Sequence, residues 1–226
     1  MGEETTQALC PGAVLMPWAS KVRAIVARFV PGQEDGNALA DILFGDVNPS
    51  GHLPLSFPPN DTATWLHTAE QYPGVNKRQW YTEGLQVGYR YYDAAGVQPL
   101  WPFGHGLSYT TFEYSGLSVT PQPNGDVVVQ VKVTNTGKRP GAAVPQLYLG
   151  FPLAAGEPPK VFRSFRRVLL QPGETAVATF DTLHPRPDMS IWDTAADGWA
   201  PVRGTFQVMV GASAGDIHLQ ETLVVA

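Results

Sequence analysis

The residues of this sequence best suited to chemistry are carboxylates that lie beside aromatic side chains. Glu83 is the clearest example, because Trp80, Tyr81 and Tyr89 are its near neighbours along the chain. Apolar surroundings disfavour a charged carboxylate, raise its pKa and suit it to acid catalysis. A structural hydrogen-bond role is the alternative for Glu83, and it is the one that we favour.

Aromatic residues also mark a polar stretch, residues 59–82, which is rich in Pro, Asn, Asp and Thr. Trp65, Trp80 and Tyr81 lie in this stretch. Exposed aromatic rings in a polar loop stack on ligands such as sugar rings, or they pack against a neighbouring domain. We weigh these two roles equally, and we take Trp65, Trp80, Tyr81 and Glu83 as candidate substrate-binding residues.

Other kinds of site find little support in the sequence. The histidines are scattered without metal-ligand spacing, and no phosphate-binding glycine loop is present, so we predict no metal and no cofactor. Asp181 and His184 are close along the chain, but without a Gly-x-Ser-x-Gly motif they do not indicate a hydrolase triad. The five histidines are His52, His67, His105, His184 and His218.

Composition narrows the choice of partners. The net charge of −5 argues against a nucleic-acid partner, because no basic face compensates for it. The apolar runs fall far short of a membrane span, so we predict no membrane partner. Cys10 is the only cysteine, which excludes an internal disulfide and leaves the compartment open. A secreted or extracellular parent protein is our working hypothesis.

The first half of the chain has the pattern of an α/β layer. The apolar spacing in Val22–Val30 predicts a short helix or a buried strand. A second helix should follow, capped by Asp35 or Asn37 and ended by a left-handed Gly45. Leu53–Pro58 alternates, but its prolines confine it to the edge of a sheet. The apolar face of the second helix consists of Ala38, Leu39, Ile42, Leu43 and Phe44.

The second half alternates with the period of strands. About seven short runs, spaced by roughly ten residues, predict a β-sandwich of about a hundred residues. This half shows no catalytic constellation, so we expect it to be structural. The runs are Val127–Val133, Pro145–Leu149, Val161–Leu170, Thr175–Phe180, Ser190–Trp192, Gly204–Val210 and Ile217–Val225.

The stretch between the two halves, Leu100–Phe112, is too aromatic for a flexible linker. Trp101, Phe103, Tyr109 and Phe112 demand burial, and we expect some of them to pack against each half. We therefore predict a packed, rigid hinge, with an irregular stretch inside one domain as the alternative.

Four ordered sequence blocks resemble glycoside hydrolase family 3, the β-glucosidase family. They are residues 31–41 (PGQEDGNALAD), 43–51 (LFGDVNPSG), 81–93 (YTEGLQVGYRYYD) and 103–112 (FGHGLSYTTF). Three further segments, residues 133–137, 146–148 and 170–174, resemble the family's fibronectin type III-like domain. The resemblance implies an incomplete α/β sandwich domain over residues 1–105 and an all-β, immunoglobulin/fibronectin III-like sandwich over residues 106–226.

The resemblance also implies a retaining mechanism with two carboxylates. The family's nucleophile is an aspartate in an N-terminal (β/α)8 barrel of about 250 residues, for which this chain has no room. The family's acid/base is a glutamate, and Glu3 or Glu4 is the candidate because Leu9-Cys10-Pro11 resembles the segment that follows it. Two departures weigh against this assignment: the family's Asp-Arg pair is missing, and the helix and strand expected after Pro11 are absent. A frayed acidic terminus is the alternative for Glu3 and Glu4.

The implied protein is therefore a fragment, a truncated gene model or a degenerate copy of a β-glucosidase-like enzyme. We expect it to hydrolyse terminal β-D-glucosyl residues of β-glucosides or oligosaccharides only together with the missing N-terminal barrel domain. Alone, the chain should be inactive. The alternative function is a non-catalytic carbohydrate-binding or structural module.

Overall fold

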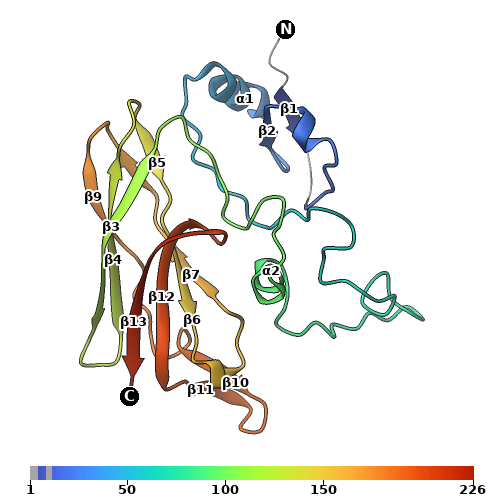
Figure 1. The fold of residues 1–226 in the computed structure, drawn as a ribbon, viewed down its shortest axis with the longest axis vertical. Coiled ribbons are helices and arrows are strands. Elements are labelled where there is room, and N and C mark those ends of the chain that lie inside the picture. The colour runs from blue at the N-terminus through green and yellow to red at the C-terminus, as the bar shows by residue number, and fades with distance from the viewer. Residues whose placement is uncertain (1–4, 9–11) are drawn as a thin grey trace. The chain divides into compact units, whose positions relative to one another are not determined.

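Figure 1 shows the computed structural model of the chain, which describes residues 5–8 and 12–226, with side chains described from residue 12 onward. Two compact units divide these residues. The first comprises the residues up to Val47 together with Leu53–Phe103, and the second comprises Asn48–His52 together with Gly104–Ala226. The short segment Asn48–His52 thus belongs to the second unit although it lies in the first half of the sequence.

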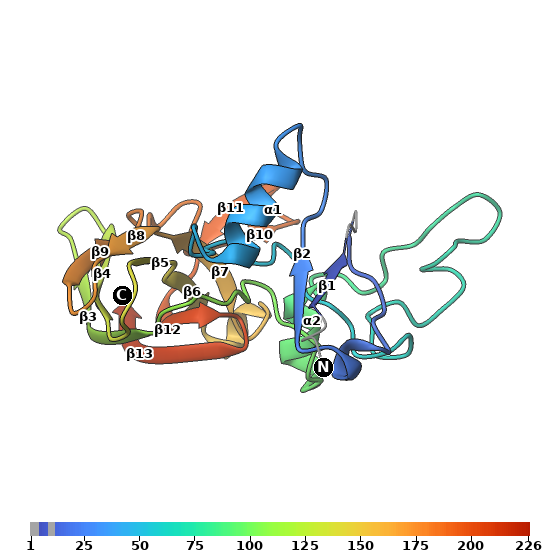
Figure 2. The ribbon, with the colours of Figure 1, turned by 90° about the horizontal axis from the view of Figure 1, so that it is seen from above.

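The first unit is a small α/β arrangement. Strand β1 (Thr5–Ala8) pairs in parallel with strand β2 (Ala24–Ala27), and the 3-10 helix η1 (Ala19–Lys21) precedes β2. Helix α1 (Asp35–Phe44) follows β2 and lies beside it (Figure 2). Of the two structures predicted for Val22–Val30, the strand is the one observed, and its residues are exposed or half-buried instead of fully buried.

Helix α1 has the predicted end and an unpredicted start. Gly45 adopts the left-handed conformation at the C-terminus with a φ of 83°, as expected for a glycine in this position. Glu34 occupies the N-cap position without a side-chain capping bond, so the prediction that Asp35 or Asn37 caps the helix was wrong. The Asp35 carboxylate is bonded to Arg28 instead, and the Asn37 amide donates to Glu34 Oε2 at 2.6 Å.

The predicted edge strand over Leu53–Pro58 was also wrong. Only one isolated bridge forms there: Phe57 N donates to the Trp101 carbonyl at 2.8 Å, and Leu100 N donates to the Phe57 carbonyl at 2.8 Å. Proline cannot donate to a ladder, and prolines at both ends of this run prevent its extension. The helix α2 (Tyr89–Ala95), which the sequence pattern did not predict, follows the long irregular segment.

The first unit has a small core among its described residues. Met16 and Phe57 are its fully buried apolar members, and Trp101 packs edge-on against Phe57 with ring centroids 5.7 Å apart. In contrast, Val30 and Phe44 are 82% and 85% exposed. Parallel sheets are normally covered on both faces, so a two-stranded one with exposed apolar neighbours is an incomplete α/β layer.

The second unit is a β-sandwich whose two main sheets lie face to face (Figure 1). One sheet has the strand order β13-β12-β6-β7 and the other β3-β4-β9, while β5-β8 and β10-β11 form separate pairs. The 3-10 helix η2 (Leu153–Ala155) follows β6. The strands are β3 (Phe112–Pro121), β4 (Val127–Asn135), β5 (Gly141–Ala143), β6 (Gln146–Gly150), β7 (Val161–Phe165), β8 (Val168–Leu170), β9 (Thr175–Thr179), β10 (Ser190–Asp193), β11 (Gly198–Pro201), β12 (Gly204–Ser213) and β13 (Asp216–Val225).

Side chains from both sheets form the core of the sandwich. Alternate residues of β4 point into it, as predicted, and their exposure is at most 2%. Facing residues come from β6 and β12, and burial of each aliphatic side chain contributes roughly 1.5–3 kcal/mol. The main inward residues are Val127, Val129, Val131, Val133, Leu147, Leu149, Phe206, Val208 and Val210.

The strand count differs from the prediction. Val161–Leu170, predicted as one run, is two strands, because the chain leaves β7 at Arg166 and Arg167 and then joins β5 as β8. Strands β3, β5 and β11 were not predicted. Eleven strands, β3 to β13, therefore occupy the second unit instead of about seven.

The aromatic residues of Leu100–Phe112 divide between the units. Phe103 stacks on Tyr89 in the first unit with ring centroids 5.0 Å apart, and Phe112 packs on the core of the second unit. Tyr109 is 43% exposed, so the prediction that it is largely buried was wrong. The guanidinium of Arg139 lies 5.8 Å from the centroid of the Tyr109 ring, so this exposed ring makes a cation–π contact.

Candidate functional site

The candidate residues of the first unit lie in the irregular segment that precedes helix α2. The buried side chain of Gln71 organises this segment. Its Oε1 accepts from the backbone N–H groups of His67 and Thr68 at 2.8 and 3.2 Å. Its Nε2 donates to the Trp65 carbonyl at 3.2 Å. A single amide thus holds several turns of a loop that has no regular secondary structure.

Glu83 is bound to the same amide. Its Oε2 accepts from Gln71 Nε2 at 3.1 Å, and this is a hydrogen bond of the structural kind. Because Gln71 also fixes the backbone at Trp65, the structure brings two of the four candidate residues to one side chain. A role of Glu83 toward substrate stays a prediction.

The other two candidates lie on the surface of the loop. Trp80 and Tyr81 are 54% and 75% exposed, and Trp80 N donates to the Glu70 carbonyl at 3.0 Å. The tip between these parts turns at Gly74, where an added Cβ would lie 2.5 Å from the Arg78 carbonyl oxygen. Only glycine fits this close approach, and its φ of +99° is one that other residues rarely adopt.

Helix α2 anchors the loop from the other side. The Tyr92 hydroxyl donates to the Ala63 carbonyl at 3.1 Å, and Tyr91 lies against the His67 ring with centroids 5.7 Å apart. Burial raises the pKa of Tyr92, with a smaller contribution from Tyr91, so its phenol stays a neutral donor. Sequence reasoning missed both Gln71 and Tyr92, because no sequence pattern singled out the bond from Gln71 to Glu83 or the bond from Tyr92 to Ala63.

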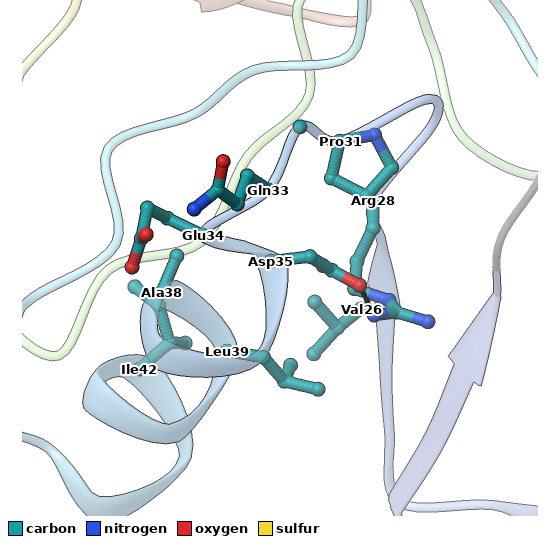
Figure 3. A pocket seen from close by; sticks show the side chains of 10 residues that line it. Val26, Arg28, Pro31, Gln33, Glu34, Asp35, Ala38, Leu39 and Ile42 are labelled. Atoms are coloured by element: carbon teal, nitrogen blue, oxygen red, sulfur yellow. Dashed lines mark hydrogen bonds and ion pairs between the residues drawn. The ribbon is translucent and has the colours of Figure 1, made fainter.

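A hollow of about 530 Å³ lies between β2 and α1 (Figure 3). Val26, Leu39 and Ile42 supply apolar walls, and the Arg28–Asp35 ion pair lies at one side. Sugar sites need several polar groups that are free to converge on the ligand. Of the charged side chains that line this hollow, Arg28 and Asp35 bind each other and Glu34 accepts from Asn37. Its lining instead suits the burial of further apolar side chains against the helix and strand.

The two family-like blocks at residues 43–51 and 103–112 meet in the second unit. Asn48 Oδ1 accepts from Ser108 Oγ at 3.0 Å and from Tyr109 N at 2.8 Å, while its Nδ2 donates to the Pro140 carbonyl at 2.9 Å. A Cβ on Gly106 would lie 2.5 Å from the Gly51 carbonyl oxygen. These blocks therefore have a structural role, as a tie between distant segments of this unit.

The histidines and carboxylates of the sandwich also have local partners. Asp181 is bonded to Arg166 and to Ser164 Oγ, which lowers its pKa to about 2, whereas His184 lies 2.8 Å from Asp126. Asp181 and His184 are thus not a relay. Among residues 5–8 and 12–226, no group of three or more His, Cys, Asp or Glu side chains could hold a metal ion.

The acid/base candidates Glu3 and Glu4 lie outside the described residues. No helix in the described part of the chain is long and apolar enough to cross a membrane.

Comparison with known proteins identifies both units. The model of the glycosyl hydrolase family 3 C-terminal domain matches residues 8–109, and that of a fibronectin type III-like domain matches residues 143–214. Thermostable beta-glucosidase B of Acetivibrio thermocellus is 43% identical over 216 residues, which cover 93% of this chain and 28% of that protein.

Solved structures agree with these matches. The crystal structure of DesR, a β-glucosidase from Streptomyces venezuelae in complex with D-glucose, has a TM-score of 0.91 at 38% identity and covers 98% of this chain and 29% of that one. For β-glucosidase 3B from Thermotoga neapolitana in complex with glucose, the TM-score is 0.84 at 34% identity, covering 98% of this chain and 31% of that one.

The fold and the matches define the class as a glycoside hydrolase α/β domain, here incomplete, followed by a fibronectin type III-like sandwich. The chain belongs to glycoside hydrolase family 3 and corresponds to the C-terminal part of its β-glucosidases. It spans about 28% of the length of the curated relatives that it matches.

Proposed function

We propose that this chain supplies the C-terminal part of a retaining β-glucosidase-type enzyme. The enzyme would release terminal β-D-glucosyl residues from β-glucosides or oligosaccharides. The observation that carries the proposal is that both domain matches, in this order along the chain, fall within one continuous similarity to β-glucosidases. Retaining hydrolysis needs two carboxylates about 5–5.5 Å apart. We assign the nucleophile to a barrel domain outside this chain and the acid/base to Glu3 or Glu4.

The uncovered surface of the first unit supports the proposal that a further part of the enzyme packs against it. Its two-stranded parallel sheet and the exposed Val30 and Phe44 leave polar backbone and apolar surface uncovered. We propose that the α/β part extends over residues 1–105 and the sandwich over 106–226. In this arrangement the residues that precede the matched region in a full-length relative would complete the sheet.

The loop that Gln71 organises is the part that we place nearest the substrate. Trp80 and Tyr81 offer exposed rings for a sugar, and Trp65 and Glu83 share the amide that fixes the loop. This role rests on their exposure and on the family. Single substitutions Trp80→Ala and Tyr81→Ala test it by their effect on the KM of the enzyme reconstituted with an N-terminal portion.

Complementation tests the proposed function. The purified 226-residue chain should not hydrolyse aryl β-glucosides above background. Mixed with the N-terminal portion of the Acetivibrio thermocellus relative, itself inactive, it should restore turnover. The substitutions Glu3→Gln and Glu4→Gln are made separately: loss of the restored activity with one of them identifies the acid/base, and activity in both removes the assignment. Turnover by the chain alone, abolished by one carboxylate substitution, would contradict the proposal.

A non-catalytic carbohydrate-binding module is the second candidate function. The exposed Trp80 and Tyr81 favour it, because aromatic platforms bind sugars without any catalytic group. The discriminating result is saccharide binding that Trp80→Ala or Tyr81→Ala abolishes, together with a failure of every complementation pair to hydrolyse the aryl glucoside.

A further inference from the structure

A pair of tryptophans stands out on the surface of the second unit. Trp192 in β10 and Trp199 in β11 are paired directly across the hairpin, so both side chains lie on the same face. Their ring centroids are 5.6 Å apart at an interplanar angle of 83°. The two side chains remain 49% and 46% exposed. We call β10, β11 and their turn the tryptophan hairpin; it projects from the end of the sandwich in Figure 1.

The hairpin has a rigid base. Ser190 is buried and its hydroxyl donates to the Pro185 carbonyl at 2.6 Å, while Val202 N donates to the carbonyl of buried Met189 at 2.8 Å. The guanidinium of Arg186 donates to the Trp199 carbonyl. A surface that is already ordered loses little conformational entropy on binding, so the two indoles are preorganised.

The turn of the hairpin is fixed as well. Asp193 Oδ1 accepts from the backbone N–H groups of Ala195 and Ala196 at 2.8 and 3.1 Å. Asp197 lies exposed one residue before the second strand. Asp193 follows Trp192 in the strand, so its side chain lies on the face opposite the rings and serves the turn. Because Arg186 also lies against the hairpin, charges of both signs are present, and neither an anionic nor a cationic ligand is favoured.

The size and chemistry of the tryptophan hairpin favour a saccharide over a protein as its ligand. Two half-exposed indoles offer far less than the roughly 800 Å² per partner that a stable protein interface buries. A neutral saccharide fits better, because a β-linked glucose ring presents flat C–H faces that can stack on aromatic rings. An edge-to-face pair also stabilises a hairpin by itself, and that purely structural role is the alternative that the experiment must exclude.

We propose that the tryptophan hairpin is a second carbohydrate-binding site, which takes neutral β-linked glucan chains. It lies in the fibronectin type III-like part of the chain and contains no catalytic carboxylate pair. It therefore goes beyond the proposed hydrolysis and does not depend on it: complementation can fail while the hairpin binds glucan, and the reverse.

The test uses the full chain and two probes, a soluble mixed-linkage β-glucan in affinity electrophoresis and cellohexaose in calorimetry. Trp192→Ala or Trp199→Ala should weaken binding at least about tenfold, as removal of a central tryptophan does at other binding surfaces. Phe165→Ala is the matched control, because Phe165 is a similarly exposed aromatic residue of the same unit, and it should leave binding unchanged. Trp80→Ala separates this site from the loop of the first unit.

A second measurement covers the case in which the alanine variants lose the hairpin structure. Trp192→Phe and Trp199→Phe retain a ring for packing and should bind with intermediate affinity. In the wild type, glucan should protect Trp192 and Trp199 from oxidation by N-bromosuccinimide, as mapped by peptide mass. Absence of binding by the wild type, binding that survives both alanine substitutions, or protection of Trp80 alone would each overturn the proposal.

Discussion

At the scale of single residues, the ionisation of Tyr114 couples the stability of the sandwich to pH. Its ring is buried in the core with the His218 ring 4.6 Å away. Burial, followed by the nearby Asp216 carboxylate, raises the pKa of Tyr114 from 10.0 to about 12. Because the folded pKa lies above the unfolded one, the stabilisation by the neutral phenol is complete below pH 10.0 and is lost as the pH rises toward 12.

We therefore expect the free energy of unfolding of the second unit to fall by about 2–3 kcal/mol between these pH values because of this residue. Urea unfolding at a series of alkaline pH values measures it. Tyr114→Phe keeps the ring and removes the titrating group, so its stability should lack this part of the decline. An identical alkaline profile for Tyr114→Phe and the wild type would contradict the assignment.

At the scale of elements, the segment Asn48–His52, which we call the strap, joins distant segments of the sandwich by hydrogen bonds. Asn48 makes three hydrogen bonds to residues far along the chain, and Gly141 lies so close that a Cβ there would come within 2.6 Å of Asn48 Nδ2. Asn48→Ala removes all three bonds and should cost about 1–3 kcal/mol. Asn48→Asp keeps the acceptor for Ser108 and Tyr109 but turns an oxygen toward the Pro140 carbonyl in place of the donor. It should still cost less, because two of the three bonds remain.

Urea unfolding of the second unit measures both changes. The strap is held in place by other contacts if Asn48→Ala is as stable as the wild type. Equal losses in the two variants would contradict the expectation that the bonds from Ser108 and Tyr109 hold the segment, because Asn48→Asp retains both of them.

The elements also show what the sequence can and cannot reveal. The alternation in β4 was predictable, because a period of two along one buried face is a local signal. The end of α1 was predictable too, because a glycine after an apolar helical pattern is also a local signal. The division of Val161–Leu170 into two strands could not be predicted, since β7 and β8 join different sheets through partners far along the chain. Of the candidate site, the aromatic residues and Glu83 were visible in the sequence, whereas Gln71 acts through contacts that only the fold creates.

At the scale of the whole molecule, the two units differ in how much core they possess. The sandwich buries a large set of aliphatic side chains between its sheets, whereas the described part of the first unit buries few. The free energy of folding should therefore reside mainly in the second unit. Substitutions in the first unit should leave the sandwich folded, because its core is built from its own strands.

Phe103→Ala tests this division. Phe103 stacks on Tyr89 within the first unit, and truncation of a packed phenylalanine costs about 3–5 kcal/mol when a cavity remains. This cost is large for a unit with a small core, so the first unit should unfold in the variant. Limited proteolysis should leave the wild type uncut within Leu100–Phe112 and release from the variant a stable fragment that begins near Phe112. Rapid cleavage of the wild type within Leu100–Phe112 would show that this segment is a loose tether, and loss of the sandwich fragment in the variant would show that the sandwich depends on the first unit.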